Sequence, residues 1–275
     1  MPVPVNLSVS GVTATSVRLN WVRGVFNPAS LFASGERGPW YDFSDLSTMF
    51  QDAAGTTPVT ANGDPLGLVL DKSGNGIHAS QSVSGRRMIY GTDGTLHWIQ
   101  GNGVNQSLVT SDVDFTNTDT LTIFSGTSRV DSTARVIAEF SQNTNNNSGS
   151  FFLISGNNVS FNAYSSFSRG SSAPNQNQTA GYSNANFITE VVSATHNIQN
   201  NLSTMRVDGI TAIDGTGNKG IGNFGNYPLF IAARNQSSLF FNGRIHQLIV
   251  RGVLSTADEI TNTELYIAEK SGVTL

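Results

Sequence analysis

The chain has 275 residues, of which 38% are hydrophobic and 12% are charged, and it contains no cysteine. A net charge of −4 provides no basic stripe to neutralise phosphates, so neither nucleic acid nor an anionic membrane is expected as a partner. The lack of cysteine excludes disulfide bonds and thiolate zinc sites, so stability must come from packing.

The first 26 residues show the alternation of a β-strand pair. Apolar side chains alternate with polar ones at Val5, Leu7 and Val9, and again at Val17, Leu19 and Trp21. This part of the chain reads PVNLSVSGVTATSVRLNW and resembles the first two strands of a fibronectin type III domain, whose remaining strands do not follow. Because an unfinished sheet edge pairs readily with another strand, residues 1–26 are expected to form a docking arm for a partner or another copy.

The same N-terminal stretch does not have the pattern of a secretory signal. It reads MPVPVNLSVSG and lacks both a basic start and a continuous apolar run. No later stretch approaches the roughly 18 apolar residues of a membrane span. We therefore expect synthesis in a host cytoplasm without a signal peptide, and no membrane partner.

Residues 27–39 contain two prolines and two glycines and are predicted to be a linker into a main domain at 40–275. Short apolar runs bounded by turn residues predict strands at 88–90, 96–99, 107–109, 121–127, 135–140, 151–154, 159–164, 187–195, 204–207, 229–233 and 244–250. The polar segments 142–150 and 165–181 have no periodicity and are predicted to be loops.

The pattern changes only near the C-terminus. Ser255, with Asp258 three residues later, can cap a helix whose apolar face includes Ile260 and Ile267 and which ends before Gly272. Many short strands followed by one terminal helix predict an all-β fold, a two-sheet jelly-roll β-sandwich with a short C-terminal helix.

Motifs at both ends of the main domain resemble one family. Residues 241–260 read FNGRIHQLIVRGVLSTADEI and resemble the closing motif of concanavalin A-like lectin and laminin G-like domains, and the following TELYIAEKSGV resembles the ending of phage-borne members. Residues 40–81 resemble a recurrent opening of phage and prophage structural proteins, and residues 96–110 stand where the family places a strand pair. The resemblance implies a concanavalin A-like domain over residues 40–275 and a place in a virion.

Metal binding is not expected from these motifs. The family commonly shows aspartates where this chain has Asn102 and Asn105, and an acidic residue where it has His246. Oxygen-bearing side chains also gather at Asp112, Asp114, Asn117 and Asp119. They could offer calcium several oxygens, but their spacing is not that of an EF-hand, and a polar turn explains them better. No cofactor is predicted.

No catalytic constellation is recognised either. Glucanases of the resembled family typically carry E-x-D-x-x-E on one strand, whereas Glu139 and Glu190 each stand alone on theirs. Residues 215–220 match G-x-G-x-x-G without the strand and helix that a dinucleotide site needs, so they predict a turn. The histidines are scattered without metal-ligand spacing at His78, His97, His196 and His246. The protein is therefore expected not to be an enzyme.

Aromatic residues near polar loops support one binding hypothesis. Sugars stack their apolar faces on aromatic rings, and amide side chains bind their hydroxyls. The aromatic residues in this setting are Trp98, Tyr164, Phe167 and Tyr182. Packing in the core explains each of them at least as well.

Together these observations favour a non-enzymatic bacteriophage virion protein that displays a lectin-like sandwich on the particle surface. Its partners would be other virion proteins and copies of itself, reached through residues 1–26. Capsid decoration, a head fibre, a tail fibre and a baseplate component all remain open. One alternative is an adhesin that binds host glycan through Tyr164 or Tyr182. A second is a polysaccharide-cleaving enzyme whose carboxylates meet only on folding.

Overall fold

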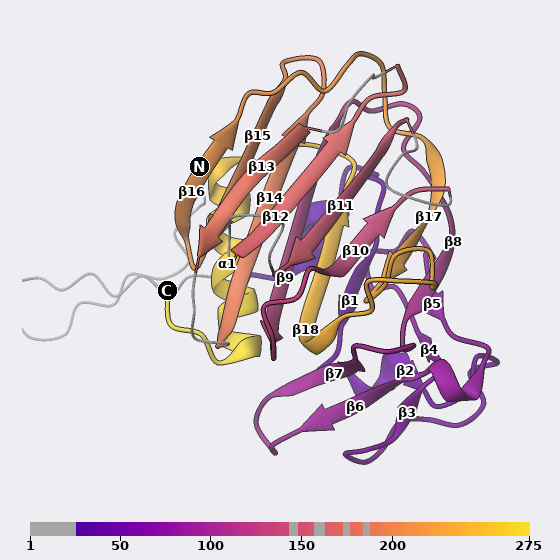
Figure 1. Ribbon diagram of the computed structural model, residues 1–275. Coiled ribbons are helices and arrows are strands. Elements are labelled where there is room, and N and C mark those ends of the chain that lie inside the picture. Colours follow the sequence, from indigo (N-terminus) through magenta and orange to yellow (C-terminus); the bar gives the residue numbers. More distant parts are fainter. Residues whose placement is uncertain (1–25, 143–147, 157–162, 173–176, 184–187) are drawn as a thin grey trace, which may run out of the picture.

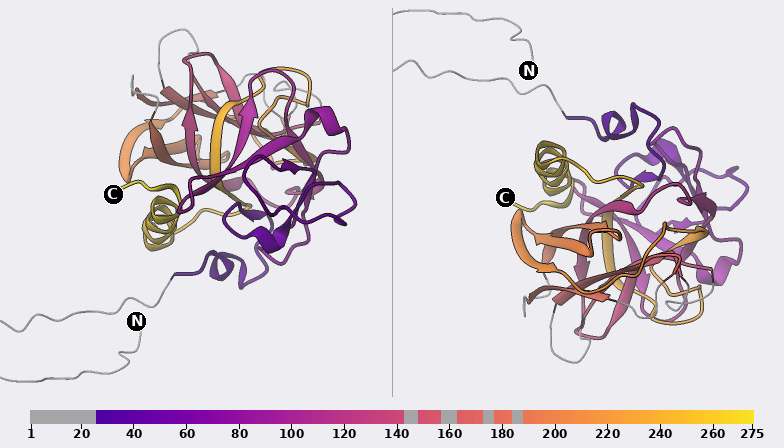
Figure 2. Two further views of the ribbon diagram at one scale, coloured as in Figure 1. Left: turned by 90° about the horizontal axis from the view of Figure 1, so that it is seen from below. Right: turned by 90° about the horizontal axis from the view of Figure 1, so that it is seen from above.

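The computed structural model describes residues 26–142, 148–156, 163–172, 177–183 and 188–275. Two antiparallel nine-stranded sheets pack face to face, and α1 (Ala257–Ser271) lies outside one of them (Figures 1 and 2). This confirms the predicted two-sheet β-sandwich with a C-terminal helix. Of the predicted arm, only Phe26 belongs to the described residues.

The sheets are named A and B. Sheet A contains, in spatial order, β16 (Ile210–Gly215), β15 (Leu202–Val207), β14 (Thr189–Asn197), β9 (Thr120–Arg129), β18 (Asn242–Arg251), β7 (His97–Asn102), β6 (Met88–Thr92) and β3 (Pro65–Leu66), with β1 (Trp40–Asp42) also paired to β18. Sheet B contains β13 (Asn177–Ser183), β12 (Ala163–Arg169), β11 (Ser150–Ser155), β10 (Arg135–Phe140), β17 (Asn226–Ile231), β8 (Leu108–Asp114), β5 (Ala79–Ser80), β4 (Leu68–Val69) and β2 (Met49–Phe50). Three short 3-10 turns accompany them, η1 (Pro28–Phe32), η2 (Leu46–Thr48) and η3 (Ser84–Arg86).

The main core lies between the two sheets. Phe140 stacks on Phe151 with ring centroids 5.4 Å apart, and Phe151 meets Phe224 edge-on at 6.0 Å. Such aromatic pairs contribute roughly 0.5–1.5 kcal/mol beyond the burial of their area. Strand β9 is buried along almost its whole length because α1 covers the outer face of sheet A. Burial on both faces therefore extends to the polar residues of this strand, such as Thr122, Ser125 and Thr127.

The terminal helix begins one residue later than the sequence predicted. Thr256 is the N-cap: its side chain accepts from the Glu259 backbone N–H, and the Glu259 carboxylate accepts from the Thr256 N–H. The hydroxyl of Ser255 instead accepts a hydrogen bond from Arg251 at 2.6 Å. Gly272 ends the helix at φ 73°, as predicted. Among the described residues, no helix has the length and apolar character needed to cross a membrane.

Residues 27–39, predicted to be a linker, pack onto the domain. Turn η1 buries Leu31 and Phe32 in a cluster with Ile267 of α1, and Figure 2 shows this indigo segment near the yellow helix. Gly38 has φ 128°, and a Cβ there would overlap the Val250 carbonyl. Only glycine therefore allows the chain to pass so close to β18.

The structure corrects the prediction in the polar segment 165–181. Strands β12 and β13 form an antiparallel pair there, with Phe167 opposite Gln178. The segment is rich in serine and asparagine and lacks alternation, so its backbone pairing left no pattern in the sequence. The strand predicted at 159–164 begins only at Ala163, and residues 157–162 lie outside the described part. Strand β16 was not predicted.

Candidate functional site

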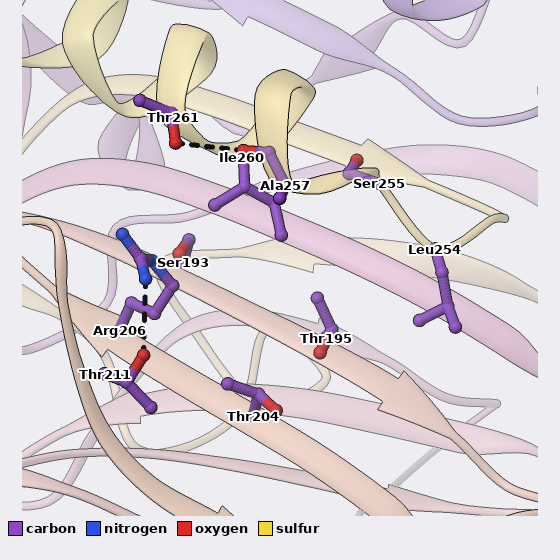
Figure 3. Close-up of a pocket in the computed structure, with 10 residues that line it drawn as sticks. All are labelled: Ser193, Thr195, Thr204, Arg206, Thr211, Leu254, Ser255, Ala257, Ile260 and Thr261. Atoms are coloured by element: carbon purple, nitrogen blue, oxygen red, sulfur yellow. Dashed lines mark hydrogen bonds between the residues drawn. The ribbon is translucent and has the colours of Figure 1, made fainter.

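A groove runs between α1 and the outer face of sheet A. Figure 3 shows the helix on one side and hydroxyl-bearing residues of the strands on the other. The volume of the groove is about 280 Å³. Arg206 donates from Nε and Nη2 to the two carboxylate oxygens of Glu264, at 2.8 and 3.0 Å, and from Nη1 to Thr211. Leu254 and Ile260 form the apolar wall. The guanidinium in this groove is therefore already occupied within the protein.

A larger cavity, of about 640 Å³, lies where three loops meet. They are the β5–β6, β7–β8 and β17–β18 connections. We call it the amide-lined cavity, and its residues are Gln81, Ser82, Val83, Arg86, Val104, Asn105, Asn235, Gln236, Ser237 and Phe240. Figure 1 shows β5 and β8 on the right of the sandwich and α1 on the left, so these loops lie away from the helix. Loops on a rigid scaffold are the usual carriers of binding residues.

The β17–β18 connection has a strained backbone. Ala232, Asn235, Gln236 and Leu239 have φ angles between 46° and 65°, although none of them is glycine. Each such residue costs on the order of 1–3 kcal/mol, and the strain persists only where the surroundings hold it in place. Asn235 and Gln236 are consecutive, and both line the cavity. The strain thus lies in the cavity wall itself.

A buried ion pair holds this connection on sheet B. Arg234 donates from Nε to Glu139 Oε2 at 2.8 Å, and Ser141 Oγ donates to the other carboxylate oxygen at 2.8 Å. The guanidinium also lies over the Phe152 ring, 5.1 Å from its centroid, and Leu239 packs against the same cluster. Glu139, which stood alone in the sequence, is fully buried. It therefore anchors the cavity wall.

Hydrogen bonds also connect this wall to the opposite loop. Gln81 Nε2 donates to the Ser107 carbonyl at 3.0 Å and to Gln236 Oε1 at 2.9 Å, and Gln81 Oε1 accepts from the Val83 N–H at 3.1 Å. A backbone carbonyl can only accept and an N–H can only donate, so they fix which end of the Gln81 amide is nitrogen. Because Gln81 Nε2 donates, the atom of Gln236 that faces it must be the acceptor Oε1. Its Nε2 donors are left without a protein acceptor in the described part of the chain.

The third wall is closed by two asparagines. Asn102 Nδ2 donates to Asn105 Oδ1 at 2.9 Å, and Asn102 Oδ1 accepts from the Val104 and Asn105 backbone N–H groups at 2.9 and 3.1 Å. Asn105 Nδ2 donates to the Gly85 carbonyl at 3.2 Å. These bonds tie the β7–β8 connection to the β5–β6 connection. Asn102 and Asn105 are thus engaged with each other and with the backbone of two loops.

Of the four aromatic residues predicted as sugar contacts, the three with described side chains do not meet in one place. Tyr164 is 1% exposed in the main core, and Phe167 is 6% exposed and stacked on Phe152 on the outer side of sheet B. Trp98 is 8% exposed beneath the Arg244 guanidinium, which lies 4.1 Å from its ring centroid. Tyr182 belongs to β13, and its side chain lies outside the described part. The three described rings are covered, and their burial does not support contact with a sugar.

The other candidate groups remain separate. The described residues contain no group of three His, Asp or Glu that could hold a metal ion. Asp114 accepts from the Thr116 N–H and hydroxyl at 3.0 and 2.6 Å, which is the geometry of a polar turn. Glu190 is buried on β14 in sheet A, whereas Glu139 lies on β10 in sheet B. His196 is buried between Ser166 and Ser203, and burial lowers its pKa to about 3.

No family model matches this sequence, and no curated protein matches it. Solved structures do match. Domain 4 of AbnA, a GH43 extracellular arabinanase from Geobacillus stearothermophilus, in complex with arabinotriose, gives a TM-score of 0.51 at 14% identity over 83% of this chain and 98% of that one. A GH54 arabinofuranosidase gives 0.58 at 12% identity over 89% of this chain and 66% of the other.

The binding domain of Botulinum neurotoxin DC in complex with SialylT gives a TM-score of 0.53 at 9% identity over 72% of this chain. The matched region is 48% of that chain, so the sequence spans about half of it. Likeness at identities of 9–14% is evidence of shared architecture. The chain thus has the fold of a lectin-like β-sandwich.

Proposed function

We propose that this protein is a non-enzymatic glycan-binding domain and that the sugar binds in the amide-lined cavity. The observation that carries the proposal is the strained wall at Asn235 and Gln236, whose amides line a cavity of about 640 Å³. Amides hydrogen-bond to sugar hydroxyls, and the half-buried Phe240 adds apolar surface. Small-ligand sites commonly measure about 300–1,000 Å³.

The comparisons support this reading. The AbnA domain was solved with arabinotriose and the toxin binding domain with SialylT, so domains of this architecture occur in complexes with such ligands. Because one fold serves many functions, the proposal depends on the cavity rather than on the likeness.

Binding without cleavage follows from the chemistry of the wall. Glycoside hydrolysis in most families uses two carboxylates that flank the bond to be broken. The amide-lined cavity presents an arginine and amides from its three loops. Glu139, beneath this wall, is engaged by Arg234 and Ser141. Release of reducing ends from a bound polysaccharide would contradict this part of the proposal.

The proposed setting is the surface of a bacteriophage virion, with residues 1–26 as the attachment to another virion protein. The support is the resemblance of residues 40–81 to an opening of phage structural proteins and of residues 263–273 to the ending of phage-borne members of the resembled family. The described chain begins at Phe26, whose ring lies 6.4 Å from that of Tyr266 on α1. Mass spectrometry of purified virions tests this setting, and absence of the protein from every particle would refute it.

A glycan microarray tests the binding function. The wild-type protein is expected to bind a defined set of glycans. Asn235→Gly removes one amide while permitting the positive φ of that position, and it should abolish or strongly weaken the signal. The matched control is Thr195→Ala in the groove beside α1, which should leave binding unchanged. No binding on a broad array, or equal loss in both variants, would refute the cavity as the site.

A further inference from the structure

We infer that the amide-lined cavity selects an acidic sugar, with Arg86 and Gln236 binding its carboxylate group. This inference rests on the proposed glycan-binding function and adds the chemical class of the ligand. It is carried by the balance of donors and acceptors in the cavity wall.

Unlike four other arginines of the chain, Arg86 has no acidic partner among the described residues. Arg135, Arg206, Arg234 and Arg251 each form an ion pair with a carboxylate. Arg86 is exposed at the cavity, and among the described residues its guanidinium has no ion pair and no hydrogen bond. Within that part of the chain it is a positive charge without a counter-ion, in a protein of net charge −4.

The backbone of Arg86 is nevertheless well fixed. Its N–H donates to the Val83 carbonyl at 3.0 Å, and its carbonyl accepts from the Ser107 N–H at 3.1 Å. These two bonds fix the position from which the Arg86 side chain extends on the turn η3. A planar guanidinium binds a carboxylate through two parallel hydrogen bonds, which a spherical ion or a neutral hydroxyl does not match.

Gln236 adds further donors on the facing loop. Its oxygen is turned to Gln81, so its Nε2 hydrogens remain for a ligand. On the β7–β8 connection, Asn105 is partly engaged, because its oxygen accepts from Asn102 and its Nδ2 donates to the Gly85 carbonyl. The described lining of the cavity contains no carboxylate. The wall thus combines the donors of Arg86 and Gln236 with no negatively charged acceptor among its described lining residues.

A carboxylate is the group that matches such a wall. A sugar hydroxyl both donates and accepts, whereas an ionised carboxylate only accepts. Val83 and Val104, 53% and 69% exposed at the rim, can cover the apolar face of a sugar ring. The ligand is therefore a uronic or sialic acid residue rather than a neutral hexose.

The experiment compares acidic and neutral sugars by isothermal titration calorimetry with the full chain. Trigalacturonic acid is paired with galactotriose, and 3′-sialyllactose is paired with lactose. At least one acidic sugar should bind about tenfold or more tightly than its neutral partner, and its affinity should fall as sodium chloride rises. The two pairs distinguish uronic from sialic acid.

Two variants test the named residues. Arg86→Gln removes the charge, and Gln236→Glu keeps an oxygen for Gln81 while replacing the amide donors by a carboxylate oxygen. Both should weaken the acidic sugar about tenfold, to the level of the neutral one, while Arg37→Gln, at an exposed arginine outside the cavity, should not. Unchanged thermal unfolding in the Arg86 variant shows that the fold is intact.

The outcomes separate the inference from the function on which it rests. Equal affinity for acidic and neutral sugars, or full affinity in Arg86→Gln, overturns the inference and leaves glycan binding in place. Failure of every sugar to bind overturns both.

Discussion

The ion pair between Glu139 and Arg234 allows a quantitative test of how the cavity wall is held. The two charged groups are 2.8 Å apart, and the side chain of Glu139 has no exposed surface. Arg234→Met keeps an apolar stem over Phe152 but removes the charge. The carboxylate is then left buried with only the Ser141 hydroxyl as a partner.

Breaking a buried pair by removing one partner typically costs about 3–5 kcal/mol, because a charge stays in the interior uncompensated. For a domain of this size, about 2–4 °C of melting temperature corresponds to each kcal/mol, so Arg234→Met should lower Tm by about 10 °C. Urea unfolding followed by tryptophan fluorescence gives the free energy of unfolding directly, and a thermal scan by circular dichroism gives Tm.

The double variant Glu139→Gln with Arg234→Met is the decisive comparison. It leaves no unpaired charge in the interior, so it should recover most of the stability lost in the single variant. Arg37→Met, at an exposed arginine, should change stability by less than about 0.5 kcal/mol. The reasoning is refuted if Arg234→Met stays within about 1 kcal/mol of the wild type, or if the double variant is no more stable than the single one.

Three further predictions concern other parts of the fold. Burial lowers the pKa of His196 to about 3 and that of His246 to about 4, from 6.5 in the unfolded chain. Below about pH 6.5 the unfolded state therefore binds protons that the folded state does not. As the pH is lowered from there, the free energy of unfolding should decrease by up to about 1.4 kcal/mol per pH unit for each histidine. Urea unfolding between pH 7 and pH 4 measures this, and a flat profile would contradict it. Thr256→Ala removes the N-cap of α1 and should cost about 1 kcal/mol in the same assay, with Thr261→Ala inside the helix as the smaller control. Gly272→Ala places a Cβ 2.7 Å from Leu96 at φ 73° and should lower Tm, so an unchanged Tm would argue against the tight C-cap.

The features that could be read from the sequence are those encoded locally. The run at 135–140 predicted β10 with its observed bounds because a strand between two covered faces needs consecutive apolar side chains. Gly272 marked the end of α1 because a left-handed residue favours glycine. The N-cap was placed one residue early because Ser255 and Thr256 are equally suited to capping. In the folded chain the Ser255 hydroxyl accepts a hydrogen bond from Arg251, and Thr256 is the N-cap.

The candidate site was decided by the tertiary structure. Gln81 and Gln236 are 155 positions apart. Their hydrogen bond depends on the β5–β6 and β17–β18 connections meeting where each passes from sheet B to sheet A, and on the ion pair of Arg234. No local sequence pattern distinguishes Arg86 from the arginines that form an ion pair with a carboxylate. Likewise, Tyr164 and Phe167 lie in a polar stretch of sequence, yet sheet pairing buries both. Sequence reasoning therefore succeeded for the strands with a marked apolar pattern and for the end of the terminal helix, because these signals lie within a few neighbouring residues. Which polar groups remain free for a ligand depends on long-range packing, and only the folded chain shows it.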